Sequence, residues 1–175
     1  MYREKFLRDY ARSGREWSGI YDYLRIIKRH ELRFIYYGRK GETTKRKKYW
    51  KIRQYLLGQK YGLEMNFENI GAGLRLIHPW GITVNEQCKC GENLTLFKGV
   101  TIGVVRGGLR AGCPTIGNNV TICMNSSVVG GITIGNDVVI AANSFVDFDV
   151  PDGSVVVGSP GVIHKRKSLF NEFSY

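Results

Sequence analysis

Residues 115–150 read TIGNNV-TICMNS-SVVGGI-TIGNDV-VIAANS-FVDFDV when they are divided into sixes. The second place of every unit is isoleucine or valine, from Ile116 to Val146, and the sixth place is valine, isoleucine or serine. An α-helix repeats its buried face about every 3.6 residues and a strand every second residue, so a sustained period of six belongs to neither alone. Six residues fit one short strand and one tight turn, and three such units close a triangular coil. Stacked coils then bury one continuous core, as in a solenoid.

The same register continues upstream, with two interruptions. The upstream core positions are Ile70, Leu76, Val84, Cys90, Leu96 and Ile102. Eight residues separate Leu76 from Val84, so two extra residues lie beside His78. Fourteen separate Ile102 from Ile116, which predicts an extruded loop at residues 104–114. A regular stack that breaks at only two places suggests that those places carry function.

Glycine and asparagine recur where the coil must turn. The glycines that follow a core position are Gly71, Gly91, Gly103, Gly117 and Gly135, and the asparagines further round the coil are Asn93, Asn119, Asn125 and Asn143. Both residue types tolerate a positive φ at low cost, so we expect corners at these places. An antiparallel β-sandwich would instead show a period of two and variable strand spacing, and the unvarying six makes it the weaker interpretation.

The charge is unevenly distributed along the chain. Residues 1–69 contain 18 Lys or Arg against 8 Asp or Glu, whereas residues 70–175 contain 8 against 7. We therefore predict a basic α-helical N-terminal segment at residues 1–61, a mainly β coil at residues 62–167 that includes the loop, and a C-terminal tail at residues 168–175.

Two stretches of the basic segment have helical periodicity. Over residues 13–30 the apolar residues have the spacing of an amphipathic helix; they are Trp17, Ile20, Tyr21, Leu24 and Ile27. Over residues 44–57 one side carries Tyr49, Ile52, Tyr55 and Leu56, and the remaining positions are rich in Lys and Arg. Gly58 is expected to end this second helix.

The basic segment suggests several partners that charge alone cannot separate. It could contact anionic lipid as a peripheral membrane surface, approach a phosphate-bearing acceptor, or be a solvated face of packing helices. Nucleic acid is not expected as a partner, because no recognition motif is present. No stretch approaches 18 apolar residues, and the start Met1–Lys5 lacks the apolar region of a secretory signal.

The cysteines are expected to be structural. Cys88 and Cys90 occupy neighbouring inward positions of the coil, and Cys123 follows the core residue Ile122. A second cysteine pair that would complete a zinc site is absent, so no metal is predicted. Buried and reduced cysteines fit a cytoplasmic location, including the inner face of a membrane.

His78 is the candidate catalytic residue. It lies at the first break of the coil and is followed by Pro79, which has no amide hydrogen and fixes its own φ. A neutral imidazole can remove a proton from an alcohol at physiological pH. A corner histidine satisfied by backbone groups is the ordinary alternative. His30, at a helix end, and His164, in a basic tail, are expected to be exposed to solvent.

These motifs resemble the serine acetyltransferase group of hexapeptide acyltransferases. The resemblance covers residues 62–166 and rests on the six-residue coil and three segments: His78-Pro79-Trp80-Gly81-Ile82-Thr83-Val84, Val100-Thr101-Ile102-Gly103 and Gly158-Ser159-Pro160-Gly161. It implies a left-handed parallel β-helix, a homotrimer, and acetyl-CoA bound as acyl donor in a groove between neighbouring coils. His78 would then deprotonate an acceptor hydroxyl that attacks the thioester directly, with backbone amides near the loop stabilising the oxyanion.

The same resemblance implies roles for other residues. Positions implied for the donor are Gly103, Ala141, Ala142, Ser159, Pro160, Lys165 and Arg166. The family's aspartate that orients the histidine aligns with Leu63, so the adjacent Glu64 is the carboxylate offered for that role. Asn85 and Cys113 are assigned to acceptor binding, Cys113 standing where serine acetyltransferases have a second histidine.

These departures favour an acceptor other than serine. A short basic head, Asn85 and the segment from Ala111 to Gly117 look more like O-acetyltransferases of surface-polysaccharide pathways, such as the colanic acid type. A sugar hydroxyl, free or lipid-linked, is therefore the expected acceptor, and L-serine is the alternative. Cys113 could also be a reactive thiol in this loop, but a neutral cysteine packed against the coil is the safer interpretation.

Two further alternatives lie outside this chemistry. A zinc-dependent carbonic anhydrase on the same coil would need three histidines, and besides His78 only His30 and His164 exist, both outside the coil proper. A non-catalytic trimeric scaffold would retain the fold without using His78.

Overall fold

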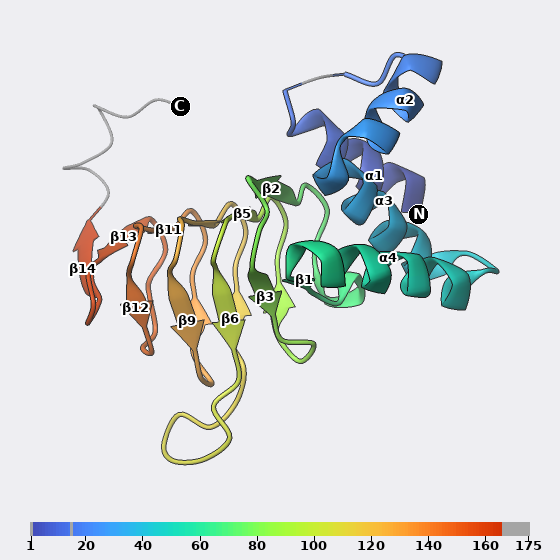
Figure 1. Cartoon of the computed structure of the whole chain (residues 1–175). Coiled ribbons are helices and arrows are strands. Elements are labelled where there is room, and N and C mark those ends of the chain that lie inside the picture. Colours follow the sequence, from blue (N-terminus) through green and yellow to red (C-terminus); the bar gives the residue numbers. More distant parts are fainter. Residues whose placement is uncertain (1, 15, 166–175) are drawn as a thin grey trace.

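The computed structural model describes residues 2–14 and 16–165 of the 175-residue chain. A helical head stands at one end of a coil of short parallel strands, and one long loop projects from the coil (Figure 1). The tail at residues 168–175 and the candidate donor residue Arg166 lie outside the described residues.

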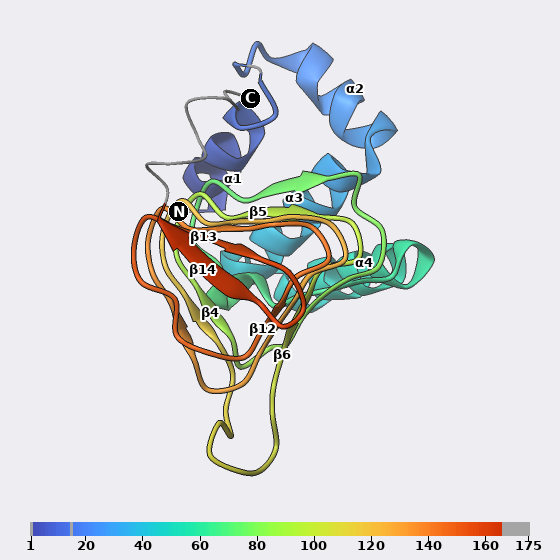
Figure 2. The ribbon, with the colours of Figure 1, turned by 90° about the vertical axis from the view of Figure 1, so that its left-hand side faces the viewer.

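The coil is a left-handed parallel β-helix, as the sequence predicts. Its strands are β1 (Leu63–Glu64), β2 (Arg75–Ile77), β3 (Ile82–Val84), β4 (Lys89–Cys90), β5 (Thr95–Phe97), β6 (Thr101–Gly103), β7 (Thr115–Ile116), β8 (Thr121–Ile122), β9 (Ser127–Val129), β10 (Thr133–Ile134), β11 (Val139–Ile140), β12 (Phe145–Val146), β13 (Ser154–Val157) and β14 (Val162–Lys165). They form three sheets, with orders β1-β3-β6-β9-β12, β10-β7-β4 and β14-β13-β11-β8-β5-β2. Seen along its axis, the coil is triangular (Figure 2).

The period-six positions are the core. Ile116, Ile122, Val128, Ile134, Ile140 and Val146 are at most 2% exposed. Strands pair in register with the strand one coil away, for example Ile122 with Ile140. Burying each such side chain contributes about 1.5–3 kcal/mol, so the repeat is what stabilises the stack.

The corners confirm the prediction for asparagine and contradict it for glycine. Asn93, Asn119, Asn125 and Asn143 have φ between 57° and 59°. The five predicted corner glycines do not have positive φ. Four of them instead stack in a column: a Cβ on Gly91 would lie 2.7 Å from the carbonyl oxygen of Gly117. These glycines are needed because backbones of successive coils approach closely, not because the chain turns at them.

Within residues 2–14 and 16–61 the head contains four helices, two more than the sequence pattern predicts. They are α1 (Tyr2–Ala11), α2 (Ile20–Lys28), α3 (His30–Thr43) and α4 (Lys47–Tyr61). The predicted helix at residues 13–30 is shortened to α2, and α1 and α3 were not predicted. Gly58 does not end α4: the helix continues to Tyr61, and its C-cap is Gly62 with φ 63°.

A buried ion pair joins the head to the first coil. Arg39 of α3 and Asp9 of α1 are each at most 2% exposed, and Nε of Arg39 donates to Oδ2 of Asp9 at 2.7 Å. Arg39 also donates to the carbonyl oxygens of Ile70 and Gly71, at 2.8 and 2.5 Å. Asp9 accepts from the amides of Gly73 and Leu74, both at 2.7 Å. The pair thus supplies partners for backbone groups that the first coil would otherwise leave open.

Across residues 2–14 and 16–165, none of the helices combines the length and apolar character needed to traverse a bilayer.

Candidate active site

His78 lies at the corner between β2 and β3, where the coil has two extra residues. The regular left-handed position of this corner is occupied by Gly81, with φ 64°, and in the next coils by Gly99 and Asn125. His78 adds a second left-handed residue, with φ 48°, and Pro79 behind it is buried. A positive φ is uncommon outside glycine and indicates a conformation held by its surroundings. The corner therefore holds an exposed imidazole on a fixed backbone.

A cleft of about 220 Å³ separates this corner from the head. Its coil side is formed by Leu74–Pro79, and its head side by Arg29, His30, Glu31, Leu32 and Ile35, with Asp9 and Ser13 completing it. His78 and His30 therefore line the same cleft. His30 is not the exposed helix end that the sequence suggested: it begins α3, and its ring stacks on Tyr61 at 4.2 Å.

Aromatic contacts connect the head to the His78 corner. The Tyr61 ring also meets Trp80 edge-on, at 5.4 Å between centroids. His30, Tyr61 and Trp80 thus form a chain of rings from α3 through the end of α4 to the corner. Such pairs add about 0.5–1.5 kcal/mol beyond the area they bury. These rings connect the start of α3, on the head side of the cleft, to the corner that carries His78.

Charged groups around the cleft differ in how they are partnered. Asp9 is fully engaged by Arg39 and two amides, and Arg29 pairs with Glu31. Arg75, one residue before Leu76, makes no ion pair with an acidic side chain within residues 2–14 and 16–165, and its charge together with burial lowers the pKa of Arg12. Burial is the larger of these two causes. Sequence reasoning missed Arg29, His30 and Arg75 as cleft residues because the cleft exists only where the head docks on the coil.

Glu64 remains a prediction as the group that orients His78. It lies in β1, beside Thr83 of β3. In the described part of the chain, the side chains of Glu64 and His78 make no hydrogen bond or ion pair with each other.

The extruded loop leaves the coil at a different corner. It connects β6 to β7, between the first and second sheets, whereas His78 connects the third sheet to the first. Val105 and Gly112 pair across the base of the loop. Asn85 caps the equivalent corner one coil earlier, its Oδ1 accepting from the amide of Gln87 at 3.0 Å.

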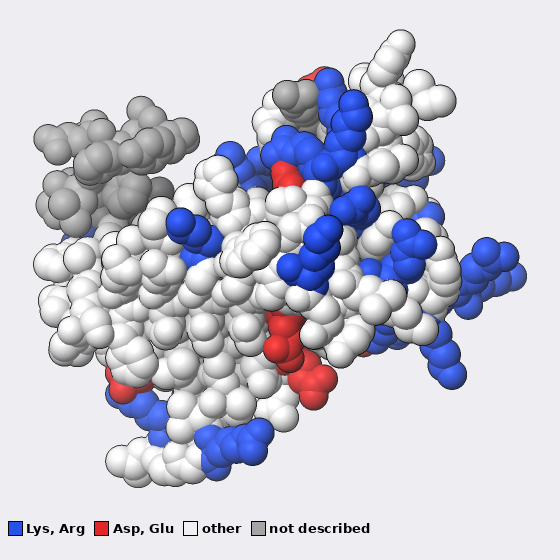
Figure 3. All heavy atoms as spheres, in the orientation of Figure 1, with Lys and Arg blue, Asp and Glu red and all other residues white. Residues whose placement is uncertain are grey.

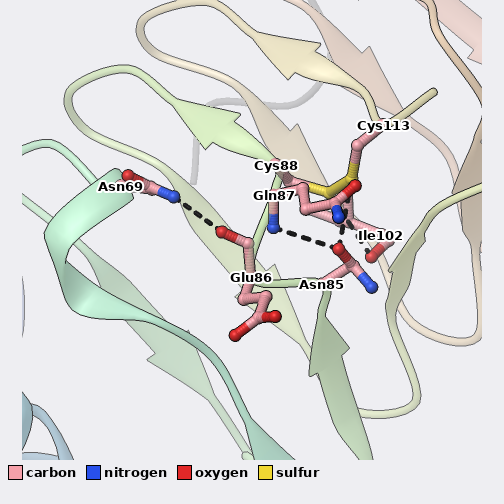
Figure 4. The surroundings of a disulfide bond; sticks show 7 residues. All are labelled: Asn69, Asn85, Glu86, Gln87, Cys88, Ile102 and Cys113. Atoms are coloured by element: carbon pink, nitrogen blue, oxygen red, sulfur yellow. Dashed lines mark hydrogen bonds between the residues drawn. A yellow bond between two sulfur atoms is a disulfide. The ribbon is translucent and has the colours of Figure 1, made fainter.

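A disulfide joins the end of the loop to the coil, which corrects the prediction of reduced cysteines. Cys113 is bonded to Cys88, and Asn85 Oδ1 lies 3.7 Å from the sulfur of Cys113 (Figure 4). Cys113 is therefore neither a packed neutral thiol nor a reactive free thiol in this structure. Because Cys88 and Cys113 are oxidised, the cysteines no longer support a cytoplasmic location, which stays a prediction. Cys90 and Cys123 are free, and burial raises the pKa of Cys90 to about 12.

The positions predicted for the donor fall on two edges of the triangle. Ala141 and Ala142 lie at the β11–β12 corner, on the edge that carries His78, and Ser159 and Pro160 follow β13 on that edge. Gly103 lies at the base of the loop, on the other edge. Lys165 ends β14 at the far end of the coil. One protomer does not bring these two edges together.

Within the described residues, no three His, Cys, Asp or Glu side chains gather as metal ligands would. His164 lies in β14, at the opposite end of the coil from His30 and His78.

Comparison with known proteins gives a consistent set of relatives. Residues 113–147 match the family described as bacterial transferase hexapeptide (six repeats). Serine acetyltransferases from Staphylococcus xylosus and from a Staphylococcus aureus strain are 38% and 41% identical over 128 and 100 residues, 71% and 57% of this chain. This chain spans only 59% and 47% of those relatives.

The solved structures agree on the fold. A Neisseria gonorrhoeae serine acetyltransferase superimposes with a TM-score of 0.76 at 28% identity, covering 94% of this chain and 67% of that one. The complex of that enzyme with serine gives a TM-score of 0.75 at 26% identity, covering 93% and 69%. The likeness therefore includes the helical head as well as the coil.

Proposed function

Since this chain carries the hexapeptide repeat of bacterial transferases and is related to serine acetyltransferases, we propose that it is an acetyl-CoA-dependent O-acetyltransferase. The observation that carries the proposal is the exposed His78 on a rigid left-handed corner, facing a cleft large enough for a small acceptor.

The proposed reaction is direct acyl transfer. A ring nitrogen of His78 takes the proton of the acceptor hydroxyl, and the hydroxyl oxygen bonds to the carbonyl carbon of the acetyl thioester. The carbon–sulfur bond then breaks, and the leaving thiolate of CoA recovers the proton from the imidazolium. General-base catalysis of this kind contributes about 10²–10⁴-fold in rate. The negative charge that develops on the carbonyl oxygen needs amide donors, which the loop backbone would supply.

The relatives favour L-serine as the acceptor over the sugar that the sequence motifs suggested. Serine acetyltransferases match this chain in sequence and in fold, and one of the similar structures is a complex with serine. The acceptor would enter the cleft between β2 and α3, where Arg75 offers a cation to a carboxylate.

A sugar hydroxyl remains the second candidate because of one observation. The loop position where serine acetyltransferases have a second histidine is Cys113, and this cysteine is held in a disulfide with Cys88. A site built for serine would lose that second imidazole, whereas a bulkier acceptor would not need it.

A third part of the proposal concerns assembly. Three copies packed edge to edge would set the loop edge of one protomer against the His78 edge of the next. That arrangement would bring Gly103 of one copy to the same groove as Ala141 of another, and the donor would lie between them.

The test compares acceptors and histidine variants. Purified full-length protein is given acetyl-CoA with L-serine, or with free and nucleotide-linked sugars, and loss of the thioester is followed by absorbance. We expect turnover with L-serine and a loss of about 10²–10⁴-fold in His78→Ala. His164→Ala, at the far end of the coil, is the matched control and should keep full activity.

Each unexpected result has a defined meaning. Turnover with sugars but not with L-serine would mean that the acceptor is a sugar hydroxyl and that L-serine is not. Equal turnover in His78→Ala and the original protein would exclude His78 as the base. A protein that releases no CoA with any acceptor, yet assembles normally, would instead be a scaffold.

A further inference from the structure

Helix α4 presents an apolar stripe to solvent. It packs through Trp50, Gln54, Leu57 and Gly58, whose side chains are the less exposed ones. The opposite side carries Tyr49, Ile52 and Leu56, which are 47%, 58% and 60% exposed. Positions three, four and seven residues apart share one face of a helix, so these three form a continuous stripe. A surface helix normally has polar residues there.

Cations border this stripe. Helix α4 contains five Lys or Arg and no Asp or Glu. Lys47 and Lys51 pair with Glu68, but Lys48 and Lys60 make no ion pair within residues 2–14 and 16–165. Arg53 donates to the hydroxyls of Tyr37 and Tyr49, so its charge also has no acidic partner there.

Helix α2 has the same character. The residues that the sequence predicts as its apolar face are solvent-exposed: Ile20 is 74% exposed, Leu24 52% and Ile27 62%. The residues it buries are Asp22 and Ile26. An apolar face that remains uncovered while an aspartate is buried is the reverse of ordinary packing, and it indicates that something outside this chain covers α2.

The two faces are joined through Arg33 of α3. Its guanidinium donates to the carbonyl oxygen of Ile27 at 2.8 Å. Arg33 also lines a groove of about 230 Å³ together with Tyr37, Arg53, Leu56 and Leu57. We call the exposed residues of this region, together with the half-buried Arg33, the head surface. Its members are Ile20, Leu24, Ile27, Arg33, Lys48, Tyr49, Ile52, Arg53, Leu56 and Lys60.

We propose that the head surface docks on an anionic lipid bilayer. Amphipathic helices that lie in a membrane interface combine aliphatic and aromatic side chains with Lys and Arg, and both features are present here. The apolar side chains would enter the acyl boundary, and the cations would reach lipid phosphates. This docking would place the cleft and His78 close to the membrane surface.

Charge favours a bilayer over a second copy of the chain. Residues 20–61 contain 13 Lys or Arg against three Asp or Glu. Lys and Arg gather over the helical head in Figure 3, while the coil in the same view is largely uncharged. Two head surfaces facing each other would set cation against cation, which is destabilising, whereas an anionic leaflet complements the charge.

The experiment is vesicle flotation with the full-length protein. Vesicles of phosphatidylcholine alone are compared with vesicles of equal parts phosphatidylcholine and phosphatidylglycerol. We expect the protein to float with the anionic vesicles only, and less well as salt is raised. Lys48→Gln combined with Lys60→Gln should weaken binding by about fivefold for each cation removed. Ile52→Glu combined with Leu56→Glu should weaken it at least about tenfold.

The matched control is Val162→Glu combined with Ile163→Glu. These residues are 56% and 39% exposed on β14, at the opposite end of the molecule, so the same change should leave flotation unaltered. Retained vesicle binding by the Ile52/Leu56 variant, or no binding by the original protein, would overturn the proposal. So would sedimentation showing that this variant dissociates a larger assembly while lipid binding is absent, because the head surface would then be an interface between copies.

Discussion

His78 differs from the other left-handed residues of the coil in its chemistry. Among the described residues, the remaining non-glycine residues with positive φ are all Asn or Asp, which have short side chains suited to this conformation. His78 has a larger ring and adopts the same backbone at φ 48°. The spacing of Leu76 and Val84 locates this insertion from sequence, but it cannot give the φ, which depends on how Pro79 packs.

The glycine column leads to a prediction at the scale of single residues. A Cβ on Gly117 would lie 2.7 Å from the backbone of Gly135, and that backbone cannot move without disturbing the next coil. Gly117→Ala should therefore lower the free energy of unfolding by about 1–3 kcal/mol. Chemical denaturation at a fixed protein concentration measures this difference.

Gly107 provides the matched control for that substitution. It lies in the extruded loop, and a Cβ there would meet nothing within 4 Å. Gly107→Ala should change the unfolding free energy by less than about 0.5 kcal/mol. Equal stability of the two variants would show that the column tolerates a methyl group.

At the scale of elements, the coil and the head differ in how far sequence predicts them. The coil strands follow from the period of six, because each unit contributes its second and sixth residues to the core of a stack of similar units. Helix α3 has no such signal: it contains Gly38 and Gly41 and is held by Arg39, which it buries against Asp9 of α1. That contact spans 30 residues of sequence, so no local pattern predicts it.

The buried aspartate of α2 gives a pH prediction. Asp22 accepts hydrogen bonds from the Tyr10 hydroxyl, the Ser18 amide and Arg25, and these lower its pKa to about 2, the Tyr10 contact having the largest effect. The ordinary pKa is about 3.9. A carboxylate with a lowered pKa stabilises the fold above its ordinary pKa, and this stabilisation is lost as pH falls toward the folded value.

Thermal unfolding of Asp22→Asn against the original protein tests this. The difference in melting temperature should be largest near pH 7 and should shrink as pH falls from about 4 to about 2. A difference that stays constant across this range would mean that the contact stabilises the head without using the carboxylate charge.

At the scale of the whole molecule, the proposed shared site predicts complementation. His78→Ala and a variant with residues 105–112 replaced by a short glycine-serine linker should each be inactive alone. In trimers mixed at random, about a quarter of the grooves would pair an intact His78 with an intact loop. Refolding the two variants together should therefore restore about a quarter of the original activity.

If the refolded mixture recovers no activity, the loop of one protomer and His78 of the next do not act in the same groove. The control is to mix the two separately folded variants without refolding, which should stay inactive for as long as their subunits do not exchange. Sedimentation of each variant alone confirms that its assembly is intact.

The candidate site is predictable from sequence only in part. His78 is located by the break in the repeat, whereas Asn85 is offered for the acceptor site only by the family resemblance. The head wall of the cleft, with Arg29 and His30, depends on how α3 docks on the coil, which no pattern in the chain encodes. The Cys88–Cys113 bond links residues 25 positions apart, and their spacing alone does not distinguish it from reduced thiols.

The contacts of Asp9 and Arg39 also bear on how long a coil can grow. A stack of similar rungs has an open strand edge at each end. The unpaired backbone groups of such an edge can form hydrogen bonds with another stack. Here the first rung is sealed by one carboxylate and one guanidinium, and the last parallel strand, β13, is covered by β14 running the opposite way. Removing the Asp9–Arg39 pair would leave these backbone groups of the first rung unpaired, so that a strand from another molecule could pair with them.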